Sequence, residues 1–509
     1  MKKVRALFVV AMVLLIAGFA FAGKAEDKAI IAMQTEPSKL NPITYQDTET
    51  DFVLSAICDP LVELTAQGDY TAKGAVIESY SVSEDGKVYT FNIREGITFH
   101  NGEPLTAEDV KFTYEAFMDP SLGSPHHQYY ADIEEVVLAD EYTVEVHLAD
   151  RNVTFLTTAR LRNHVLPKDY IEEVGWTGYQ KKPIGSGPYQ FVVHVPGQRI
   201  VLRRYEDYWG EKAKIKYAEF RFYPEVTTAT MALQAKQVDF IAELPAEEYQ
   251  MLKNAPGLKY GTFTKFEDHR ICFNKRPDSV FSDVKVRQAV AYAINREELI
   301  ALTRGEMAVP AVGRIPYFHA AYSPDTPAYE QDLEKAKGLL EEAGYPEGFK
   351  TKIYAPAGYR ERVLEVQQIQ RQLSQIGIEV EVVTLEWGTY LDVTAEGEAP
   401  MFRERWSASA PSPFGFVENW YSKSSWNPIF GTYHNEEADR LLEKIKVTVN
   451  EQERWELYKE LQNIALEDVA CYPLYWPIEG VAYNDELNIP EELFNVFLRP
   501  IYNINKWSY

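Results

Sequence analysis

Alternating apolar and polar positions predict a β-hairpin near the middle of the chain. Tyr189–Val195 and Arg199–Arg204 both alternate in this way, and Pro196-Gly197 lies between them. Strict alternation is typical of half-buried strands, and a Pro-Gly pair is typical of the turn that joins them. Gly185 and Gly187 come just before the first strand. Since glycine takes positive φ without steric cost, we expect a tight turn with positive φ there.

Helix-period and strand-period patterns alternate along the rest of the chain. Apolar residues three to four positions apart predict helices, and short apolar or alternating runs predict strands. The predicted helices cover 288–299, 333–343, 361–376 and 450–467, and a helix followed by a strand covers 229–242. The predicted strands cover 29–33, 87–93, 142–148, 350–354 and 379–385. This mixture predicts an α/β fold.

One helix start is marked clearly in the sequence. Thr106 and Asp109 have the spacing of a capping box, in which each side chain accepts a hydrogen bond from the other residue's backbone N–H. Val110, Tyr114 and Phe117 follow at intervals that place them on one face of the helix. We expect these three side chains to lie in a hydrophobic core.

Five stretches resemble one protein family, and they occur in the family's order. Residues 183–210, PIGSGPYQFVVHVPGQRIVLRRYEDYWG, resemble the GTGPY and YWG signature of family 5 extracellular solute-binding proteins, the receptors of peptide-type ABC importers. Residues 281–299, FSDVKVRQAVAYAINREEL, are similar to another motif of the family. So are 84–115, 334–348 and 369–390. The resemblance extends over nearly all of the chain after its first 22 residues.

The resemblance implies a periplasmic-binding-protein-like α/β fold with two large lobes joined by a hinge. It implies three discontinuous domains with mixed sheets: a hinge-side lobe of 23–58, 183–269 and 479–509, an inserted subdomain of 59–182, and a second lobe of 270–478. In such a receptor the lobes close over one ligand. We expect a monomer without a cofactor that presents the closed form to an ABC permease complex in the inner membrane.

The first 22 residues have the features of a secretory signal peptide. Basic residues stand at the start, an apolar run covers 6–21, and Ala20-Phe21-Ala22 precedes Gly23. No cysteine stands directly after the expected cleavage site, so the lipid-anchoring signal common in the family is missing. We expect a periplasmic mature chain that begins at Gly23. The alternative, an uncleaved anchor, has an apolar run shorter than the roughly 20 residues that a membrane span needs.

Composition and charge narrow the possible partners. The chain has 509 residues, of which 46% are hydrophobic, which is enough for two or three cores. Its 76 acidic and 52 basic residues give a net charge of −24, which disfavours nucleic acid and anionic lipid as partners.

The chain has three cysteines, Cys58, Cys272 and Cys471, so at least one is unpaired. We expect them to be buried small hydrophobes rather than a metal site, and the sequence leaves their pairing open.

Catalytic and metal motifs are largely missing. The sequence has no HExxH, CxxC, GxSxG or phosphate-loop motif. Ser282 and Lys285 fit SxxK, but they lie within a family motif in which the serine is expected to cap the next helix. His126-His127 lack a third ligand at metal-binding spacing. We therefore predict no catalytic and no metal residues, and a secreted hydrolase is only a remote alternative.

The resemblance also indicates candidate ligand residues. They are Thr35, Glu36 and Tyr45 near the start, and Trp387, Arg403, Trp406, Ser407, Ser409, Trp420, Trp426 and Tyr433. Trp387 and Trp406 match the spacing of two cleft tryptophans in oligopeptide-binding members. Arg403 falls where some members hold a peptide carboxylate, which a guanidinium binds through two parallel hydrogen bonds. The alternatives are an outward-facing Arg403, a turn role for Glu36, and core roles for most of the aromatic residues.

Ser409 departs from the pattern of the peptide-binding members. They carry an aspartate three positions after the tryptophan that corresponds to Trp406, and this aspartate pairs with the peptide's amino group. Loss of such a charge-assisted hydrogen bond costs about 1.5–3 kcal/mol, so Glu36 or Glu404 would have to take its place. The loop 407–421 instead resembles loops of oligosaccharide-binding members. A peptide is the first ligand prediction and an oligosaccharide the second.

Overall fold

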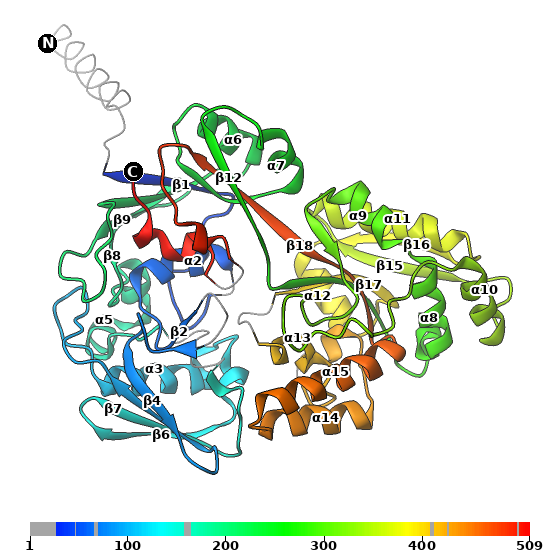
Figure 1. The fold of residues 1–509 in the computed structure, drawn as a ribbon, viewed down its shortest axis with the longest axis horizontal. Helices are drawn as coiled ribbons and strands as arrows, with labels where there is room; N and C mark the ends of the chain where they lie inside the picture. The colour runs from blue at the N-terminus through cyan, green and yellow to red at the C-terminus, as the bar shows by residue number, and fades with distance from the viewer. Residues whose placement is uncertain are drawn as a thin grey trace, which may run out of the picture.

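The two lobes of the molecule lie side by side and are joined by long strands (Figure 1). The computed structural model describes residues 27–45, 47–65, 70–156, 164–407, 412–424, 427–495 and 498–509. Helices and mixed sheets alternate in both lobes, as predicted for an α/β fold. The predicted signal peptide lies outside the described residues. No helix among the described residues is both long and apolar enough to cross a membrane.

One twelve-stranded sheet runs through both lobes. Its strands are β1 (Lys28–Met33), β8 (Tyr189–Val195), β9 (Arg199–Arg204), β10 (Tyr217–Phe222), β11 (Phe240–Leu244), β12 (Leu258–Thr264), β13 (Glu267–Phe273), β14 (Ala308–Pro310), β15 (Lys350–Pro356), β16 (Glu379–Leu385), β17 (Met401–Ser407) and β18 (Cys471–Asn484). Their order is β16-β15-β17-β13-β18-β11-β1-β10-β9-β8, with β12 and β14 also paired to β18. The start of β18 pairs with β13 in the second lobe, and its end pairs with β11 and β12 in the first. This strand and the β12–β13 connection therefore form the crossing between the lobes.

A smaller sheet forms the lower part of the first lobe in Figure 1. Its strands are β4 (Ile77–Val82), β5 (Val88–Ile93), β7 (Thr143–Leu148) and β6 (Ile133–Asp140), in this order, and a separate pair joins β2 (Glu63–Leu64) to β3 (Tyr70–Thr71). Helix α3 (Ala107–Met118) packs on the four-stranded sheet, and its predicted capping box is confirmed. Val110, Tyr114 and Phe117 are all buried in this core, as predicted.

Most helices lie on the faces of the large sheet. In the first lobe they are α2 (Thr48–Ile57), α6 (Val226–Gln234) and α7 (Ala246–Leu252). In the second they are α8 (Val284–Ala293), α9 (Arg296–Thr303), α10 (Leu333–Glu342), α11 (Arg360–Ser374), α12 (Trp387–Ala395), α13 (Phe414–Val417), α14 (Glu436–Val447) and α15 (Glu451–Glu467). Helix α5 (Lys168–Lys181) instead packs with α3 in the core of the four-stranded sheet. Short 3-10 helices are η1 (Pro120–Leu122), η2 (His127–Tyr130), η3 (Val280–Ser282), η4 (Glu418–Trp420), η5 (Pro428–Phe430), η6 (Glu491–Leu493) and η7 (Pro500–Lys506).

Three local predictions were wrong, two because of a nearby capping side chain and one because of packing against α2. The predicted helix 288–299 is broken, because Asn295 caps the start of α9 with its side chain. The helix after 282 is capped by Asp283, whose side chain accepts from Lys285 N, and not by the serine. The glycines before β8 have no positive φ. A Cβ on Gly185 would lie 2.4 Å from the Ile57 carbonyl oxygen, so close packing against the end of α2 requires glycine there.

The second lobe has a hydrophobic core on each face of its part of the sheet. Ile271 and Phe273 of β13 point into one core with α8 to α11, and Cys272 between them points into the other with α12, α14 and α15. Strand β13 is consequently buried along its whole length. Residues of this strand and its neighbours can meet solvent only where the strands leave the sheet near the crossing.

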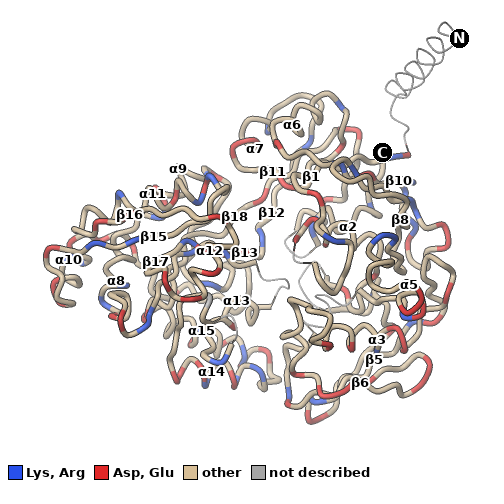
Figure 2. Tube along the Cα trace, turned by 180° about the vertical axis from the view of Figure 1, so that it is seen from behind, with Lys and Arg blue, Asp and Glu red and all other residues tan. Residues whose placement is uncertain are grey.

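The lobes also contact each other away from the crossing. Val153 N donates to the Lys446 carbonyl at 2.9 Å, which joins the first lobe to α14. Lys446 Nζ lies 3.9 Å from Asp132 Oδ2 in the same region. Acidic residues are spread over both lobes rather than gathered on one face (Figure 2). The structure is therefore one in which the lobes touch at both ends of their boundary.

Candidate ligand-binding site

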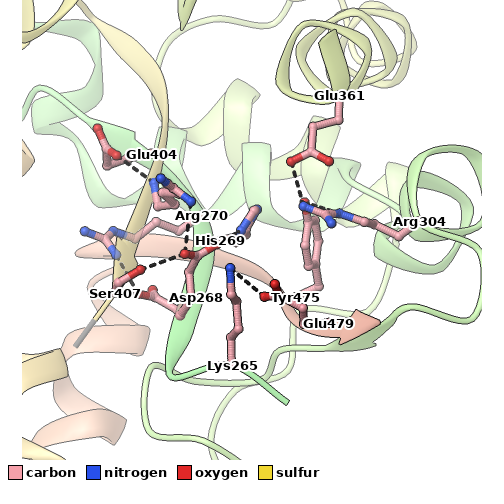
Figure 3. Close-up of polar contacts among 12 residues, drawn as sticks. Lys265, Asp268, His269, Arg270, Arg304, Glu361, Glu404, Ser407, Tyr475 and Glu479 are labelled. Carbon is pink, nitrogen blue, oxygen red and sulfur yellow. Dashed lines mark hydrogen bonds and ion pairs between the residues drawn. The ribbon is translucent and has the colours of Figure 1, made fainter. Parts of the chain in front are cut away.

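A cluster of charged residues lies where the strands cross between the lobes. Lys265 follows β12, and its Nζ lies 2.9 Å from Glu243 Oε1 and 2.6 Å from Glu479 Oε2 (Figure 3). Burial acts to lower the pKa of Lys265, but the two carboxylates outweigh it and raise that pKa. Burial raises the pKa of Glu479 to about 7. Lys265 therefore stays charged and balances the two glutamates of β11 and β18.

On the second-lobe side, Glu267 is the centre of a hydrogen-bond network. It accepts from Ser407 Oγ at 2.6 Å, from Arg405 Nη1 at 3.1 Å and from the ring of His269 at 2.7 Å. Burial acts to raise the pKa of Glu267, but Arg405 and His269 hold that pKa well below its usual range. The side chain of Arg405 is 40% exposed. Ser407, one of the predicted site residues, therefore lies in a charged and partly solvated cluster.

Arg403 is completely buried and fully occupied by protein groups. Its guanidinium donates to Glu365 Oε2 at 2.5 Å, to the Glu404 carbonyl, and to Tyr475 Oη at 3.3 Å, and it also contacts His269 Nδ1. Burial acts to lower the pKa of Arg403, but Glu365 keeps it raised. The outward-facing alternative is wrong, because the side chain is buried. Carboxylate binding by Arg403 stays a prediction, and none of these contacts supports it.

Arg362 is a buried cation that the sequence analysis missed. It is 1% exposed, and its Nε and Nη1 have no hydrogen-bond partner among the described residues. Its guanidinium lies over the ring of Tyr359, 4.2 Å from the centroid. Burial, followed by the positive charge of Arg405, lowers the pKa of Arg362. Buried N–H groups without acceptors destabilise a protein, so a negative group of a ligand would bind favourably at Nε or Nη1.

The sequence did contain a signal for Arg362. Positions 362, 366, 369 and 373 are separated by four, three and four residues, so they lie on one helix face. Val366, Ile369 and Leu373 are all buried, and Arg362 continues their apolar row at the start of α11. A charged residue at an apolar-face position is a candidate for a functional role.

Aromatic side chains lie next to Arg362. Trp387, the first residue of α12, is 38% exposed, and its ring centroid is 6.0 Å from that of Tyr359 and 5.9 Å from that of Tyr390. Tyr359 is also exposed, at 39%. The structure thus brings the predicted site residue Trp387 into an exposed aromatic pair above a buried cation.

The other predicted aromatics are less accessible. Trp406 is half-buried and donates from Nε1 to the Gly415 carbonyl at 2.6 Å. Trp420 and Tyr433 are both buried in the core of α12, α14 and α15, and Tyr433 Oη donates to Asp468 at 2.8 Å. These two positions agree with the alternative of core packing. Trp426 lies outside the described residues.

The predicted residues near the start of the chain do not gather at the crossing. Glu36 pairs with His194 at 2.6 Å and accepts from Gly197 N at 2.8 Å, both of the β8–β9 hairpin. Tyr45 is buried, and its hydroxyl donates to Asp51 at 2.5 Å. Thr35 is exposed.

Two positions matter for a ligand amine besides Glu36: Ser409, where the aspartate of the peptide-binding members is missing, and Glu404, the other candidate to replace it. Ser409 lies outside the described residues. Glu404 is buried and accepts from Arg405 N at 2.7 Å, so its carboxylate is already held by backbone.

The motifs that we set aside have ordinary structural contacts. Lys285 pairs with Glu342 at 2.9 Å. The rings of His126 and His127 contact the Tyr45 and Phe117 carbonyls. The described residues contain no group of three or more His, Cys, Asp or Glu side chains placed to hold a metal ion.

Two lobes linked by crossing strands, with a charged cluster at the crossing, are typical of a receptor that closes around its ligand. The family model for bacterial extracellular solute-binding proteins, family 5 Middle, matches residues 71–428, more than half of the chain. The protein belongs to this family, whose members are periplasmic or extracellular substrate-binding proteins of ABC importers. Their names describe binding proteins rather than enzymes.

Individual relatives cover most of the chain. The glutathione-binding protein GsiB of Salmonella paratyphi A is 28% identical over 472 residues, 89% of this chain and 90% of its own. The periplasmic binding protein DppA of Helicobacter pylori, in complex with the peptide STSA, has a TM-score of 0.82 at 27% identity and covers 94% and 98%. AgaA of A. tumefaciens R10, in complex with agropinic acid, has a TM-score of 0.80 at 25% identity and covers 94% and 98%.

Proposed function

We propose that the protein captures a short peptide with a free carboxylate between its lobes and delivers it to an ABC permease of the inner membrane. The observation that carries this proposal is Arg362, a buried guanidinium whose Nε and Nη1 have no acceptor among the described residues. A ligand carboxylate can accept a charge-assisted hydrogen bond from either of these atoms. The relative named as glutathione-binding and the structural neighbour in complex with the peptide STSA both match most of this chain, which supports this ligand class.

Arg405 extends the positive side of the proposed site. It lies close enough to Arg362 to lower the pKa of that residue, and its own partner Glu267 neutralises only one of the two charges. Glu404 and Glu267 act on the Arg362 charge without a hydrogen bond to its Nε or Nη1 among the described residues. A neutral sugar would bring no negative charge to these two atoms, whereas a peptide carboxylate would. The charge balance therefore favours a peptide over an oligosaccharide.

The first lobe supplies the negative side. Glu243 is one-third exposed, and Glu49 lies in the first turn of α2. Burial, followed by the charge of Glu243, raises the pKa of Glu49 to about 7. A ligand ammonium group near these carboxylates would favour the charged form of Glu49. This pair is a better candidate for the amine than Glu36, which the β8–β9 hairpin occupies.

The proposal includes the predicted domain boundaries and hinge. The crossing at Lys265 is the point about which the lobes would open, and the Val153–Lys446 contact would break on opening. Trp387 and Tyr359 would then cover one side chain of the peptide. In this scheme the ligand stabilises the closed form that the permease recognises, because it binds both lobes at once.

Calorimetric titration tests the proposed ligand class directly. The ligands are short peptides with a free carboxylate, the same peptides amidated at the C-terminus, glutathione, and β-linked oligosaccharides. We expect the free acids to bind at least tenfold more tightly than the amides, since a charge-assisted hydrogen bond contributes about 1.5–3 kcal/mol. Tight binding of an oligosaccharide without binding of any peptide would contradict the proposal and favour the second candidate.

A further inference from the structure

Two of the three cysteines face each other across neighbouring strands. Cys272 on β13 and Cys471 on β18 are directly opposite residues of an antiparallel pair. Residues in such positions have Cα atoms about 4.5 or 5.5 Å apart, and a disulfide spans roughly 4.4–6.8 Å between Cα atoms. We propose that Cys272 and Cys471 form an intrachain disulfide in the mature protein. The structure shows the reduced form, in which both are free thiols.

The side chains of both residues point to the same side of the sheet. Directly opposite residues share a face, and both cysteines belong to the core that packs against α14 and α15. The positive charge of Arg270 acts on both thiols, which places both near one guanidinium. The two sulfur atoms can therefore meet by side-chain rotation, without a shift of either strand.

Cys58 is excluded as a partner by its position. It ends α2 in the first lobe, where its Sγ lies 3.8 Å from Tyr179 Oη and it packs in a different core. The three pairings that the sequence left open therefore reduce to one. Cys58 remains as the single free thiol.

The proposed reaction is an exchange with a disulfide-carrying oxidant. The thiolate of one cysteine attacks a sulfur of the oxidant, and the other cysteine then attacks the mixed disulfide. One S–S bond forms in the protein and one breaks in the oxidant, which takes up two electrons and leaves with both protons as two thiols. Members of this family work in the periplasm or outside the cell, where such oxidants act and disulfides persist.

The timing of this reaction follows from burial. Cys272 is 0% exposed and Cys471 is 2% exposed. Burial raises the pKa of Cys471 to about 12 and also raises that of Cys272. Because the thiolate is the attacking form, the folded reduced protein reacts slowly. The bond therefore forms during folding, before β18, the last strand of the chain, has closed over β13.

The disulfide would fix the part of the second lobe that leads to the crossing. Strand β13 continues back to Lys265, and β18 continues forward to Glu479. The bond would close a loop of nearly 200 residues, because the two paired strands are far apart in the sequence. It constrains the unfolded chain and stabilises this lobe, and it does not depend on the ligand.

Peptide mapping of the secreted full-length protein tests the proposal. The chain is produced by secretion into an oxidising periplasm, alkylated in denaturant so that every free thiol is accessible, and digested under non-reducing conditions. We expect a peptide pair joined through Cys272 and Cys471, lighter by about 2 Da than the two thiol peptides, and alkylation of Cys58 alone. Alkylation of all three cysteines, or a bond that involves Cys58, would overturn the proposal.

Matched variants separate the bond from a folding defect. Cys58→Ala should keep the linked peptide pair, whereas Cys272→Ala and Cys471→Ala should lose it. A reductant should lower the Tm of the wild type and of Cys58→Ala by on the order of 5 °C and leave the Tm of the double variant Cys272→Ala, Cys471→Ala unchanged. Equal Tm values with and without reductant in the wild type would count against the bond.

Discussion

Val153 donates its backbone N–H to the carbonyl oxygen of Lys446 at 2.9 Å, and this bond links the first lobe to α14 away from the crossing strands (Figure 1). When the lobes rotate apart, a contact far from the hinge is separated more than one close to it. The bond therefore favours the closed form, and the ion pair of Lys446 with Asp132 adds little because it is long and solvated.

Val153→Pro removes the donor of this bond, whereas Val153→Ala keeps it. We expect the proline variant to bind ligand about threefold to tenfold more weakly, since a net hydrogen bond contributes about 0.5–1.5 kcal/mol. Small-angle scattering of the ligand-free protein should show a larger radius of gyration for the proline variant. The same radius for both variants would show that the bond does not hold the lobes together.

Gly187 is predicted to be intolerant of any side chain. A Cβ there would lie 2.6 Å from the carbonyl carbon of Ile57, and backbone cannot move aside as a flexible side chain can. Gly187→Ala should lower the free energy of unfolding by about 1–3 kcal/mol. Gly338→Ala on α10 is the matched control, because its Cβ meets nothing within 4 Å, and it should raise stability by about 0.5–1 kcal/mol. Denaturant titration measures both, and equal effects would refute the packing argument.

Asp59 gives the first lobe a distinctive pH dependence. Burial raises its pKa to about 7, although Trp209 and Tyr208 donate to its carboxylate at 2.7 and 2.9 Å. The folded state thus binds a proton that the unfolded state releases between about pH 4 and 7. Stability from this group should fall as the pH rises through that window, by at most about 1.4 kcal/mol per unit.

Asp59→Asn removes the titrating group and keeps the shape of the side chain. The free energy of unfolding of the variant minus that of the wild type should therefore be larger at pH 8 than at pH 5. Chemical denaturation at the two pH values gives this difference. A difference that is independent of pH would mean that the Asp59 pKa is ordinary in the folded protein.

Local features of the fold were predictable from the sequence because their signals are local. The strands β8, β9 and β16 have the predicted bounds, and the capping box of α3 needs only Thr106 and Asp109. The break at Asn295 was missed because the apolar period continues across it, while the capping side chain decides the boundary. The φ angles at Gly185 and Gly187 depend on α2, which lies more than 100 positions earlier.

The site was harder to predict because charge alone does not show burial. Arg403 lies on β17, which pairs with both β13 and β15, so its side chain enters the interior and meets Glu365. Its neighbour Arg405, two positions on, is partly exposed near the strand end. Only the assembled sheet distinguishes these two arginines. The resemblance indicated Arg403 of β17, but it could not indicate Arg362 of α11, whose Nε and Nη1 have no hydrogen-bond partner among the described residues.

Arg362→Met should stabilise the ligand-free protein. Methionine has a similar length and no buried charge, so replacing an unpaired buried guanidinium should raise the free energy of unfolding by about 1 kcal/mol or more. Arg360→Met, at an exposed position on the same helix, should change it by no more than about 0.5 kcal/mol. Thermal unfolding without ligand compares the two, and a strong loss of stability in Arg362→Met would show that the charge is already satisfied.

The proposal that Arg362 binds the ligand carboxylate is tested most directly by a thermodynamic cycle. Calorimetry measures the affinity of one peptide as free acid and as C-terminal amide, for the wild type, Arg362→Met and the control Arg360→Met. We predict that Arg362→Met weakens the free acid at least tenfold and leaves the amide unchanged, while Arg360→Met affects neither. Equal losses for acid and amide, or no loss for either, would contradict carboxylate binding by Arg362.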